Sequence, residues 1–161
     1  MTAPAAAHRP WSDIGRNLGA RLRGAHTLAE RMHAFIGAAW PLLQPTGVSW
    51  MGFYERDPAN PDQLVLAARE PKPACSPIGL HGACGQSLLA ARPLVVRDVA
   101  DLGAGYIACD PSDRSEVVVP CLRADGSAWG VLDLDSHHVG CFSESDAQAL
   151  AEILRQAALS A

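Results

Sequence analysis

The chain has 161 residues, long enough for one domain to bury a hydrophobic core without disulfide or metal cross-links. Apolar residues make up 48% of it and charged residues 19%, and a net charge of −4 with scattered basic residues argues against binding to nucleic acid or a membrane surface. Its apolar runs fall short of the about 18 residues that a membrane-spanning helix needs, so we expect no membrane association.

The N-terminal part of the chain predicts a tail followed by two helices. Residues 1–11 are rich in Ala and Pro, lack the apolar segment of a secretory signal, and are expected to form a flexible tail. A single domain is expected over residues 12–161. Apolar residues recur at helical spacing over 12–43, Gly24 is expected to separate two helices, and two prolines end this region.

The middle of the chain predicts strands separated by turns and by two long loops. The run 48–55 is strand-like and rich in aromatic residues, and a Pro- and Asn-containing turn over 57–62 leads to a second strand. One long loop carries Cys75 and Cys84 and the other carries Cys109, and long loops in compact domains are usually functional. The further predicted segments are strand 64–68, loop 70–85, helix 86–91, strand 94–99 and loop 100–115.

The C-terminal part predicts a β-hairpin and a helix. Strands over 116–122 and 128–135 are joined around Asp125-Gly126, the strongest hairpin signal in the sequence. A helix over 143–159 begins with a Ser-x-x-Asp pattern that resembles a capping box. Helices, then antiparallel strands, then a helix predict an α+β fold in which helices pack on an antiparallel sheet.

Two acidic residues lie two positions apart on the second hairpin strand. Because side chains alternate along a strand, Asp133 and Asp135 share one face, while Leu132 and Leu134 share the other. Burying two acids is costly unless a positive group meets them. A metal ion is the weaker candidate for that group, because no His-x-x-x-His or Cys-x-x-Cys accompanies the pair. A substrate ammonium would also meet the acids, as would a salt bridge to Arg97, Arg114 or Arg123, and an exposed strand end would leave them in solvent.

The five cysteines fall into two groups. An odd number without an export signal predicts a cytosolic protein rather than a secreted disulfide framework. Cys121 alternates with valines on a strand and Cys141 precedes the last helix, so both are interpreted as structural. Cys75, Cys84 and Cys109 lie in loops with Gly or Pro neighbours, where redox chemistry and burial both remain open. Cys84 also lies close to a predicted helix N-terminus, where the helix dipole favours a thiolate.

The cysteines, the acids and the aromatic strand lie within short motifs. These are Trp50-Met-Gly-Phe-Tyr54, Ala74-Cys75-x-x-Ile78, Gly82-Ala-Cys84-Gly85, Asp98-Val99, Ile107-Ala-Cys109-Asp110, Ser115-Glu-Val-Val-Val-Pro120, Gly130-Val-Leu-Asp-Leu-Asp-Ser136 and Phe142. Together they resemble the free methionine-(R)-sulfoxide reductases, a family built on a single GAF domain. The segment with the two aspartates alone would indicate only a GAF domain, whereas three cysteines in these contexts with Ser-Glu are far more specific.

The resemblance implies a fold, a substrate and a reductant. The fold is a GAF domain with a central antiparallel sheet, N- and C-terminal helices on one face, and ligand-pocket loops on the other. The substrate is free methionine (R)-sulfoxide and the reductant is thioredoxin. No cofactor, metal or nucleic acid is implied.

The resemblance also implies roles for individual residues. Cys109 is expected to attack the sulfoxide sulfur and become a sulfenic acid, after which Cys75 or Cys84 condenses with it to a disulfide. Glu116 is expected to protonate the sulfoxide oxygen, because attack at sulfur builds negative charge there. The expected substrate-binding residues are Trp50 and Tyr54 around the S-methyl group and Asp133 and Asp135 at the α-ammonium, together with Glu116.

The chain departs from the family pattern in its loops. Glu70-Pro-Lys-Pro73 stands where the family usually carries Phe-Gln-Gly, and Tyr106 stands where a His usually precedes Ile-Ala-Cys. Ser49 stands where the pattern prefers Asn. These positions bear on which cysteine resolves the sulfenic acid and on how the substrate is gripped.

Two further functions are compatible with the sequence. A GAF domain can serve as a non-catalytic sensor of a small ligand or of redox state, because the fold does not decide the function. Three loop cysteines favour the enzyme over this sensor. A structural role in dimerisation through the N- and C-terminal helices is the second possibility, and such a homodimer is compatible with catalysis.

Overall fold

The structure, a computed structural model, describes residues 8–106 and 109–161. Within them, a six-stranded antiparallel sheet has the strand order β3-β2-β1-β6-β5-β4. The strands are β1 (Trp50–Arg56), β2 (Gln63–Glu70), β3 (Ile78–Gly79), β4 (Leu94–Val96), β5 (Ser115–Leu122) and β6 (Ala128–Ser136). The helices are α1 (Trp11–Leu22), α2 (Leu28–Leu43), α3 (Ala83–Ala90) and α4 (Glu144–Gln156), with 3₁₀ helices η1 (Gln44–Thr46) and η2 (Val99–Gly105).

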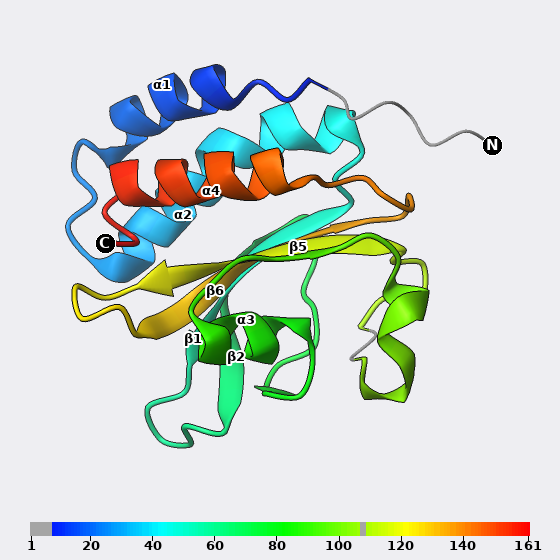
Figure 1. Cartoon of the computed structure of the whole chain (residues 1–161). Coiled ribbons are helices and arrows are strands. Elements are labelled where there is room, and N and C mark those ends of the chain that lie inside the picture. The colour runs from blue at the N-terminus through cyan, green and yellow to red at the C-terminus, as the bar shows by residue number, and fades with distance from the viewer. Residues whose placement is uncertain (1–7, 107–108) are drawn as a thin grey trace.

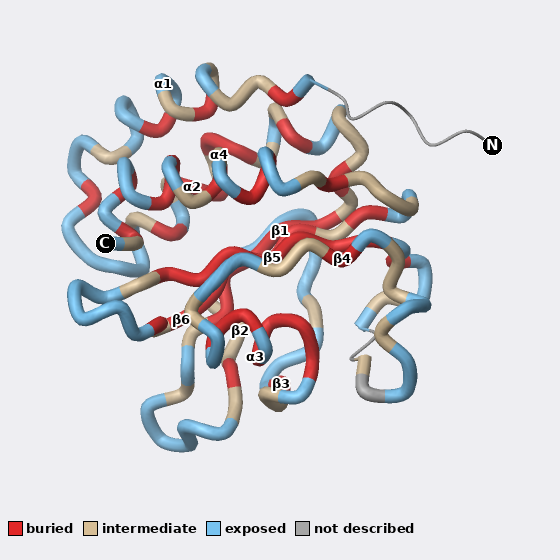
Figure 2. The backbone as a smooth tube through the Cα atoms, in the orientation of Figure 1, coloured by how far each residue is buried: buried red, intermediate tan, exposed pale blue. Residues whose placement is uncertain are grey.

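The helices divide between the two faces of the sheet. Helices α1, α2 and α4 form a layer over one face, and α3 lies against the other face together with the long loops (Figure 1). The predicted α+β class and this placement of the terminal helices are confirmed. Because one layer covers each face, the central strands are buried along most of their length (Figure 2).

The alternation of side chains along β6 separates a core from a pocket. Leu132 and Leu134 point into the helical layer and belong to the main apolar core. Val131 belongs to a second apolar cluster on the opposite face, where Asp133 also lies. The predicted hairpin around Gly126 is confirmed, and this glycine has φ +85°, a backbone conformation that a side chain would strain. The hairpin therefore fixes the register of β5 and β6, and with it which side chains face the core and which face the pocket.

The boundaries of several elements differ from the predicted ones. Helix α3 begins at Ala83 rather than at residue 86, so Cys84 and Gly85 lie within its first turn. A glycine lowers helix propensity, but here a Cβ at Gly85 would overlap the backbone of Leu80, so close packing requires it. The predicted loop 70–85 also contains β3, and the predicted loop 100–115 contains most of η2.

The N-terminal end of the domain differs from the predicted tail over residues 1–11. Residues 1–7 lie outside the described residues. Arg9, however, is 3% exposed, and its guanidinium donates a 2.7 Å hydrogen bond to the carboxylate of Asp146. Asp146 also forms the predicted capping box with Ser143 at the start of α4. The ordered fold therefore begins before residue 12, because a buried acid at α4 binds an arginine from this segment.

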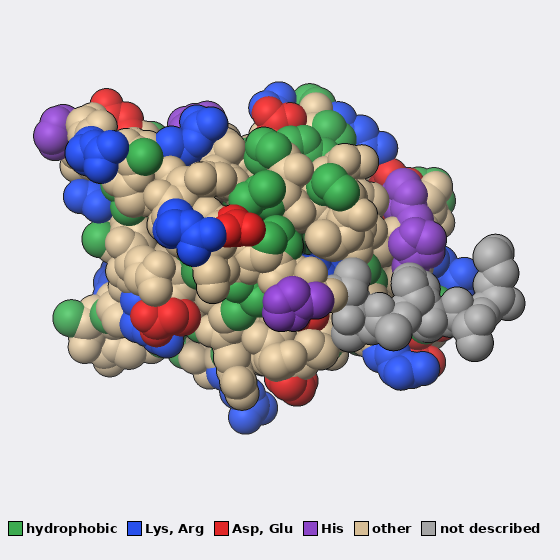
Figure 3. Space-filling view, turned by 90° about the horizontal axis from the view of Figure 1, so that it is seen from above, with side chains coloured by type: hydrophobic (Ala, Val, Ile, Leu, Met, Phe, Trp, Pro, Cys, Tyr) green, Lys and Arg blue, Asp and Glu red, His purple; other side chains and the backbone are tan. Residues whose placement is uncertain are grey.

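The surface formed by the terminal helices carries mixed charge. Lys and Arg side chains stand apart from one another across this face rather than gathering in one patch (Figure 3). Among the described residues, no helix combines the length and the apolar character needed to cross a bilayer.

The core on the helical face makes a direct stability prediction. Leu134 is fully buried, so Leu134→Ala removes apolar contacts and leaves a cavity, and we expect a loss of about 2–5 kcal/mol of unfolding free energy in urea titrations. Leu89 is 61% exposed and provides the matched control, because Leu89→Ala makes the same chemical change at the surface. Equal losses in the two variants would contradict this placement of the core.

Candidate redox site

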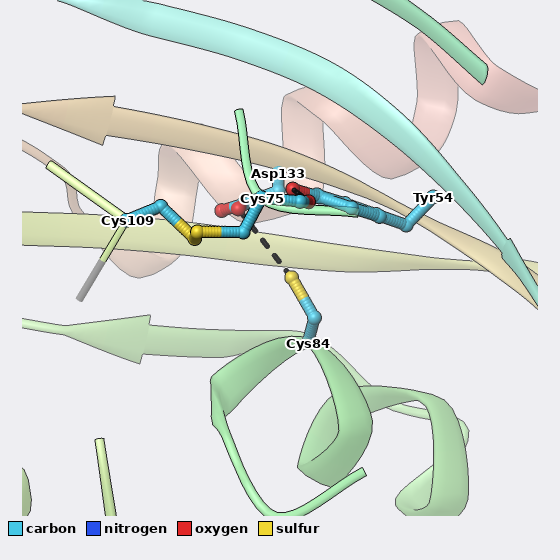
Figure 4. The surroundings of a disulfide bond; sticks show 5 residues. All are labelled: Tyr54, Cys75, Cys84, Cys109 and Asp133. Carbon is cyan, nitrogen blue, oxygen red and sulfur yellow. Dashed lines mark hydrogen bonds between the residues drawn. A yellow bond between two sulfur atoms is a disulfide. The ribbon is translucent and has the colours of Figure 1, made fainter. Parts of the chain in front are cut away.

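Two of the three loop cysteines form a disulfide. Cys75 lies in the loop between β2 and β3, Cys109 lies after η2, and their Cα atoms are 5.6 Å apart, within the normal range for a disulfide. Both cysteine residues are exposed, so a reductant can reach the bond. Figure 4 places the disulfide beside Asp133 and Tyr54. The sequence left the partner of Cys109 open, and in this structure the partner is Cys75.

Cys84 is a free thiol in the wall of the same site. It lies in the first turn of α3, is buried, and donates a 3.4 Å hydrogen bond from Sγ to Oδ2 of Asp133 (Figure 4). Burial, followed by the charges of Asp133 and Glu116, raises the pKa of Cys84 well above its usual range. The expected thiolate at this helix N-terminus is therefore wrong, because desolvation and nearby carboxylates outweigh the helix dipole.

Three carboxyl groups line the floor of the site. Glu116 on β5 stands directly opposite Asp135 on β6, and Asp133 lies two residues before Asp135 on the same face. One oxygen from each of the three lies within 4.8 Å of the others. Glu116 and Asp133 are only 4% and 7% exposed. The sheet therefore concentrates two buried acids and the half-buried Asp135 in one small volume.

No arginine or lysine among the described residues forms an ion pair with these three acids. Arg114 instead lies 3.5 Å from Asp98, and Arg123 donates to Ser127. The salt bridge considered for the aspartate pair is therefore wrong. One oxygen of Glu116 and one oxygen of Asp133 are buried and have no hydrogen-bond partner among the described groups. A proton on either carboxyl would provide a donor for the other.

Burial and mutual repulsion keep protons on this cluster. Burial raises the pKa of Glu116 to about 9, and the charge of Asp133 contributes to this rise. Burial also raises the pKa of Asp133 to about 7, but hydrogen bonds from Cys84 and Glu116 oppose this rise. Burial and the charges of Asp133 and Glu116 raise the pKa of Asp135 well above its usual range. The Glu116–Asp133 pair therefore retains a proton at neutral pH.

Two aromatic side chains of β1 close the pocket on one side. The rings of Trp50 and Tyr54 lie 6.1 Å apart, and both side chains are buried. A Cβ at Gly52 would overlap the indole of Trp50, so the glycine between them lets that ring lie flat on the strand. The cavity measures about 40 Å³, room for only a few water molecules. Every predicted site residue except Cys75 lines it: Trp50, Tyr54, Cys84, Cys109, Glu116, Asp133 and Asp135.

Two pocket residues with polar side chains were not predicted as site residues from the sequence. Tyr106 lines the cavity from the end of η2, and Asp113 lines it from the turn before β5. Burial, followed by the charge of Asp110, raises the pKa of Asp113 to about 6. The available signal was position, because both residues flank Cys109 within the same loop. The Ile107-Ala108 part of that motif lies outside the described residues.

The donor atoms limit what the site can hold. The three clustered carboxyls offer only oxygen atoms, which suit an ammonium group or a hard metal ion. A second cluster, Asp110, Asp113 and His137, lies at the rim, with the His137 ring nitrogen 3.8 Å from both carboxylates. Combined with a reducible disulfide, the buried acids can bind a small cationic molecule and supply a proton to it.

Comparisons with known proteins agree with this geometry. The GAF domain family model matches residues 25–160. The free methionine-R-sulfoxide reductase of Escherichia coli is 31% identical over 91% of this chain and 85% of its own length. GAF domain-containing protein A of Dictyostelium discoideum is 39% identical, but the match spans 66% of this chain and 65% of that protein.

A solved structure extends the likeness to three dimensions. The free methionine-R-sulfoxide reductase of Neisseria meningitidis, determined in complex with its substrate, superimposes with a TM-score of 0.79 at 33% identity. The match covers 91% of this chain and 85% of that one. The chain therefore belongs to the GAF-domain family of free methionine-R-sulfoxide reductases.

Proposed function

We propose that this protein reduces free L-methionine (R)-S-oxide to L-methionine, with Cys109 as the nucleophile and thioredoxin as the reductant. The observation that carries the proposal is the Cys75–Cys109 disulfide beside a pocket lined by three clustered carboxyls, two of them buried. The likeness to free methionine-R-sulfoxide reductases supports the choice of substrate. The proposed compartment is the cytosol, where the resting cysteines are reduced.

The first step transfers oxygen from the substrate to the enzyme. The Cys109 thiolate attacks the sulfoxide sulfur, and Glu116 gives its proton to the sulfoxide oxygen as negative charge develops there. The resulting hydroxyl passes to the Cys109 sulfur, which becomes a sulfenic acid, and methionine leaves. The raised pKa of Glu116 supports this role, because the carboxyl still holds its proton at neutral pH.

The second step removes the oxygen as water. The Cys75 thiol attacks the sulfenic sulfur of Cys109, the hydroxyl leaves as water, and a disulfide forms. The dithiol of thioredoxin then supplies two electrons and two protons to restore both thiols. The disulfide and the exposure of both cysteines support Cys75 as the resolving residue. Burial and a raised pKa make Cys84 a poor competitor and favour its role as a hydrogen-bond donor to Asp133.

The acids and aromatic rings give the proposed specificity. The α-ammonium of a free amino acid would supply the positive charge that Asp133 and Asp135 lack among the described side chains. Trp50 and Tyr54 would pack around the S-methyl group. A methionine sulfoxide within a peptide has no such ammonium, so the carboxyl cluster would gain no cationic partner from it. Free substrate is therefore preferred.

The direct test is a coupled assay. Reduced protein is mixed with free methionine (R)-sulfoxide, thioredoxin, thioredoxin reductase and NADPH, and NADPH loss is followed. We expect turnover with the free (R) epimer and little with the (S) epimer or with peptide-bound sulfoxide. Equal rates with all three substrates, or no turnover, would sink the proposed function and favour a non-catalytic sensor.

The cysteine roles predict three different phenotypes. Cys109→Ser should release no methionine, because the nucleophile is absent. Cys75→Ser should release about one equivalent of methionine and then stop with thioredoxin, because no Cys75–Cys109 disulfide can form. Cys84→Ser keeps a donor to Asp133 and should retain most thioredoxin-supported turnover. Methionine quantification and intact mass check all three, and a Cys84→Ser protein that stops after one equivalent would reassign the resolving cysteine.

The proton on Glu116 predicts a pH effect on activity. Glu116→Gln keeps the shape of the side chain but cannot donate its proton, so kcat/KM should fall by about 10²–10⁴-fold. Asp133→Asn removes an ammonium partner and should act mainly through KM. In the wild type, kcat/KM should fall as pH rises through about 9, where Glu116 loses its proton. An unchanged rate in Glu116→Gln would remove this residue as the acid.

The same proton predicts a pH effect on stability. Folded Glu116 keeps its proton up to about pH 9, whereas in the unfolded chain a glutamate loses its proton at about pH 4.3. Between these values the unfolded state binds fewer protons, so unfolding free energy falls as pH rises. Urea titrations at pH 5.5 and 8.5 should show a smaller fall for Glu116→Gln than for the wild type. Asp62→Asn, at an exposed turn, is the control and should behave as the wild type does.

A further inference from the structure

The two pocket aromatics also hold the loop that carries Cys75. The indole nitrogen of Trp50 donates a 2.8 Å hydrogen bond to the carbonyl oxygen of Lys72. The hydroxyl of Tyr54 donates a 2.7 Å hydrogen bond to the carbonyl oxygen of Cys75 itself. Both donors are 5% exposed or less and come from the same face of β1. The backbone of the Cys75 loop is therefore attached to a central strand at two points.

The Cys75 loop has few backbone hydrogen-bond donors of its own. Three of the residues from 71 to 77 are prolines, which have no backbone N–H to donate. Beyond the aromatic donors, the hydroxyl of Ser76 accepts a 3.0 Å hydrogen bond from the N–H of Leu66 on β2. A loop with so few donors of its own depends on side chains from the sheet to set the position of its thiol.

A further contact joins this loop to the segment that carries Cys109. The ammonium of Lys72 lies 2.8 Å from a carboxylate oxygen of Asp110, which directly follows Cys109. The Lys72 side chain is 60% exposed, so solvent screens this pair and its contribution is small. The partly buried hydrogen bonds from Trp50 and Tyr54 are the stronger constraints on the Cys75 loop.

We propose that Tyr54 and Trp50 are positioning residues for the resolving thiol: their hydrogen bonds to the Cys75 and Lys72 carbonyls hold Cys75 where it can attack the Cys109 sulfenic acid. This inference rests on the proposed function and deepens it. Burial raises the pKa of Tyr54, so its hydroxyl keeps the proton that it donates. The same two side chains thus form the wall of the substrate pocket and the support of the second chemical step.

Loss of one of these hydrogen bonds should have only a moderate effect on the rate of disulfide formation. A single neutral hydrogen bond shifts a rate by about three- to tenfold when it acts in the transition state. Cys75 needs to approach within bonding distance of the Cys109 sulfur, and only the fraction of loop conformations that allow this contributes to the rate. Loss of one anchor should therefore slow disulfide formation without abolishing it.

A single-turnover experiment separates the two steps. Reduced Tyr54→Phe, which keeps the ring and loses only the hydroxyl, is mixed with free methionine (R)-sulfoxide and quenched at intervals. Methionine is quantified, and intact mass after dimedone labelling distinguishes the Cys109 sulfenic acid from the disulfide. We expect disulfide formation to slow about three- to tenfold relative to methionine release, so that the sulfenic acid accumulates. Trp50→Phe, which loses the indole N–H, should shift the same ratio in the same direction.

Tyr106→Phe is the matched control. It also removes a hydroxyl from the pocket, but that hydroxyl makes no hydrogen bond to the Cys75 loop among the described residues. No excess of sulfenic acid is expected in this variant. Equal accumulation in Tyr106→Phe, or a wild-type ratio in both Tyr54→Phe and Trp50→Phe, would overturn the inference. Failure of the wild type to release methionine would instead overturn the proposed function.

Discussion

The clustering of three carboxyl groups, two buried and one half-buried, on one face of a β-sheet is the constraint on which the rest of this structure depends. Glu116, Asp133 and Asp135 lie within 4.8 Å of one another, and no cationic side chain among the described residues pairs with them. Three ionised carboxylates would repel strongly in so small a volume, so the cluster retains protons. The site is thereby prepared both to bind an ammonium and to donate a proton.

The sheet makes this arrangement possible by keeping the acids and the apolar core on opposite faces. Leu132 and Leu134 anchor β6 in the helical layer, while the aspartates between and beyond them face the pocket. The same strand therefore contributes to stability on one face and to chemistry on the other. Such a division also explains why the disulfide loops lie on the far side of the sheet from the terminal helices (Figure 1).

Short sequence patterns predicted correctly those features of the fold that depend only on residues close together in the chain. The hairpin at Gly126 and the α4 capping box follow from turn and cap chemistry, and period-two alternation predicted the faces of β6. The protonation of Cys84 could not be predicted this way, because it depends on burial and on acids distant in sequence. The partner of Cys109 and the buried contact of Arg9 likewise depend on how distant segments pack.

A measurement of proton exchange on binding tests the central claim most directly. Reduced Cys109→Ser protein is titrated with free methionine (R)-sulfoxide by calorimetry at pH 7.5, in two buffers of different ionisation enthalpy. An ammonium entering the carboxyl cluster lowers the pKa values there, so binding should release protons, and N-acetyl methionine (R)-sulfoxide should bind far more weakly. Binding without proton release, with equal affinity for the N-acetyl compound, would contradict the account.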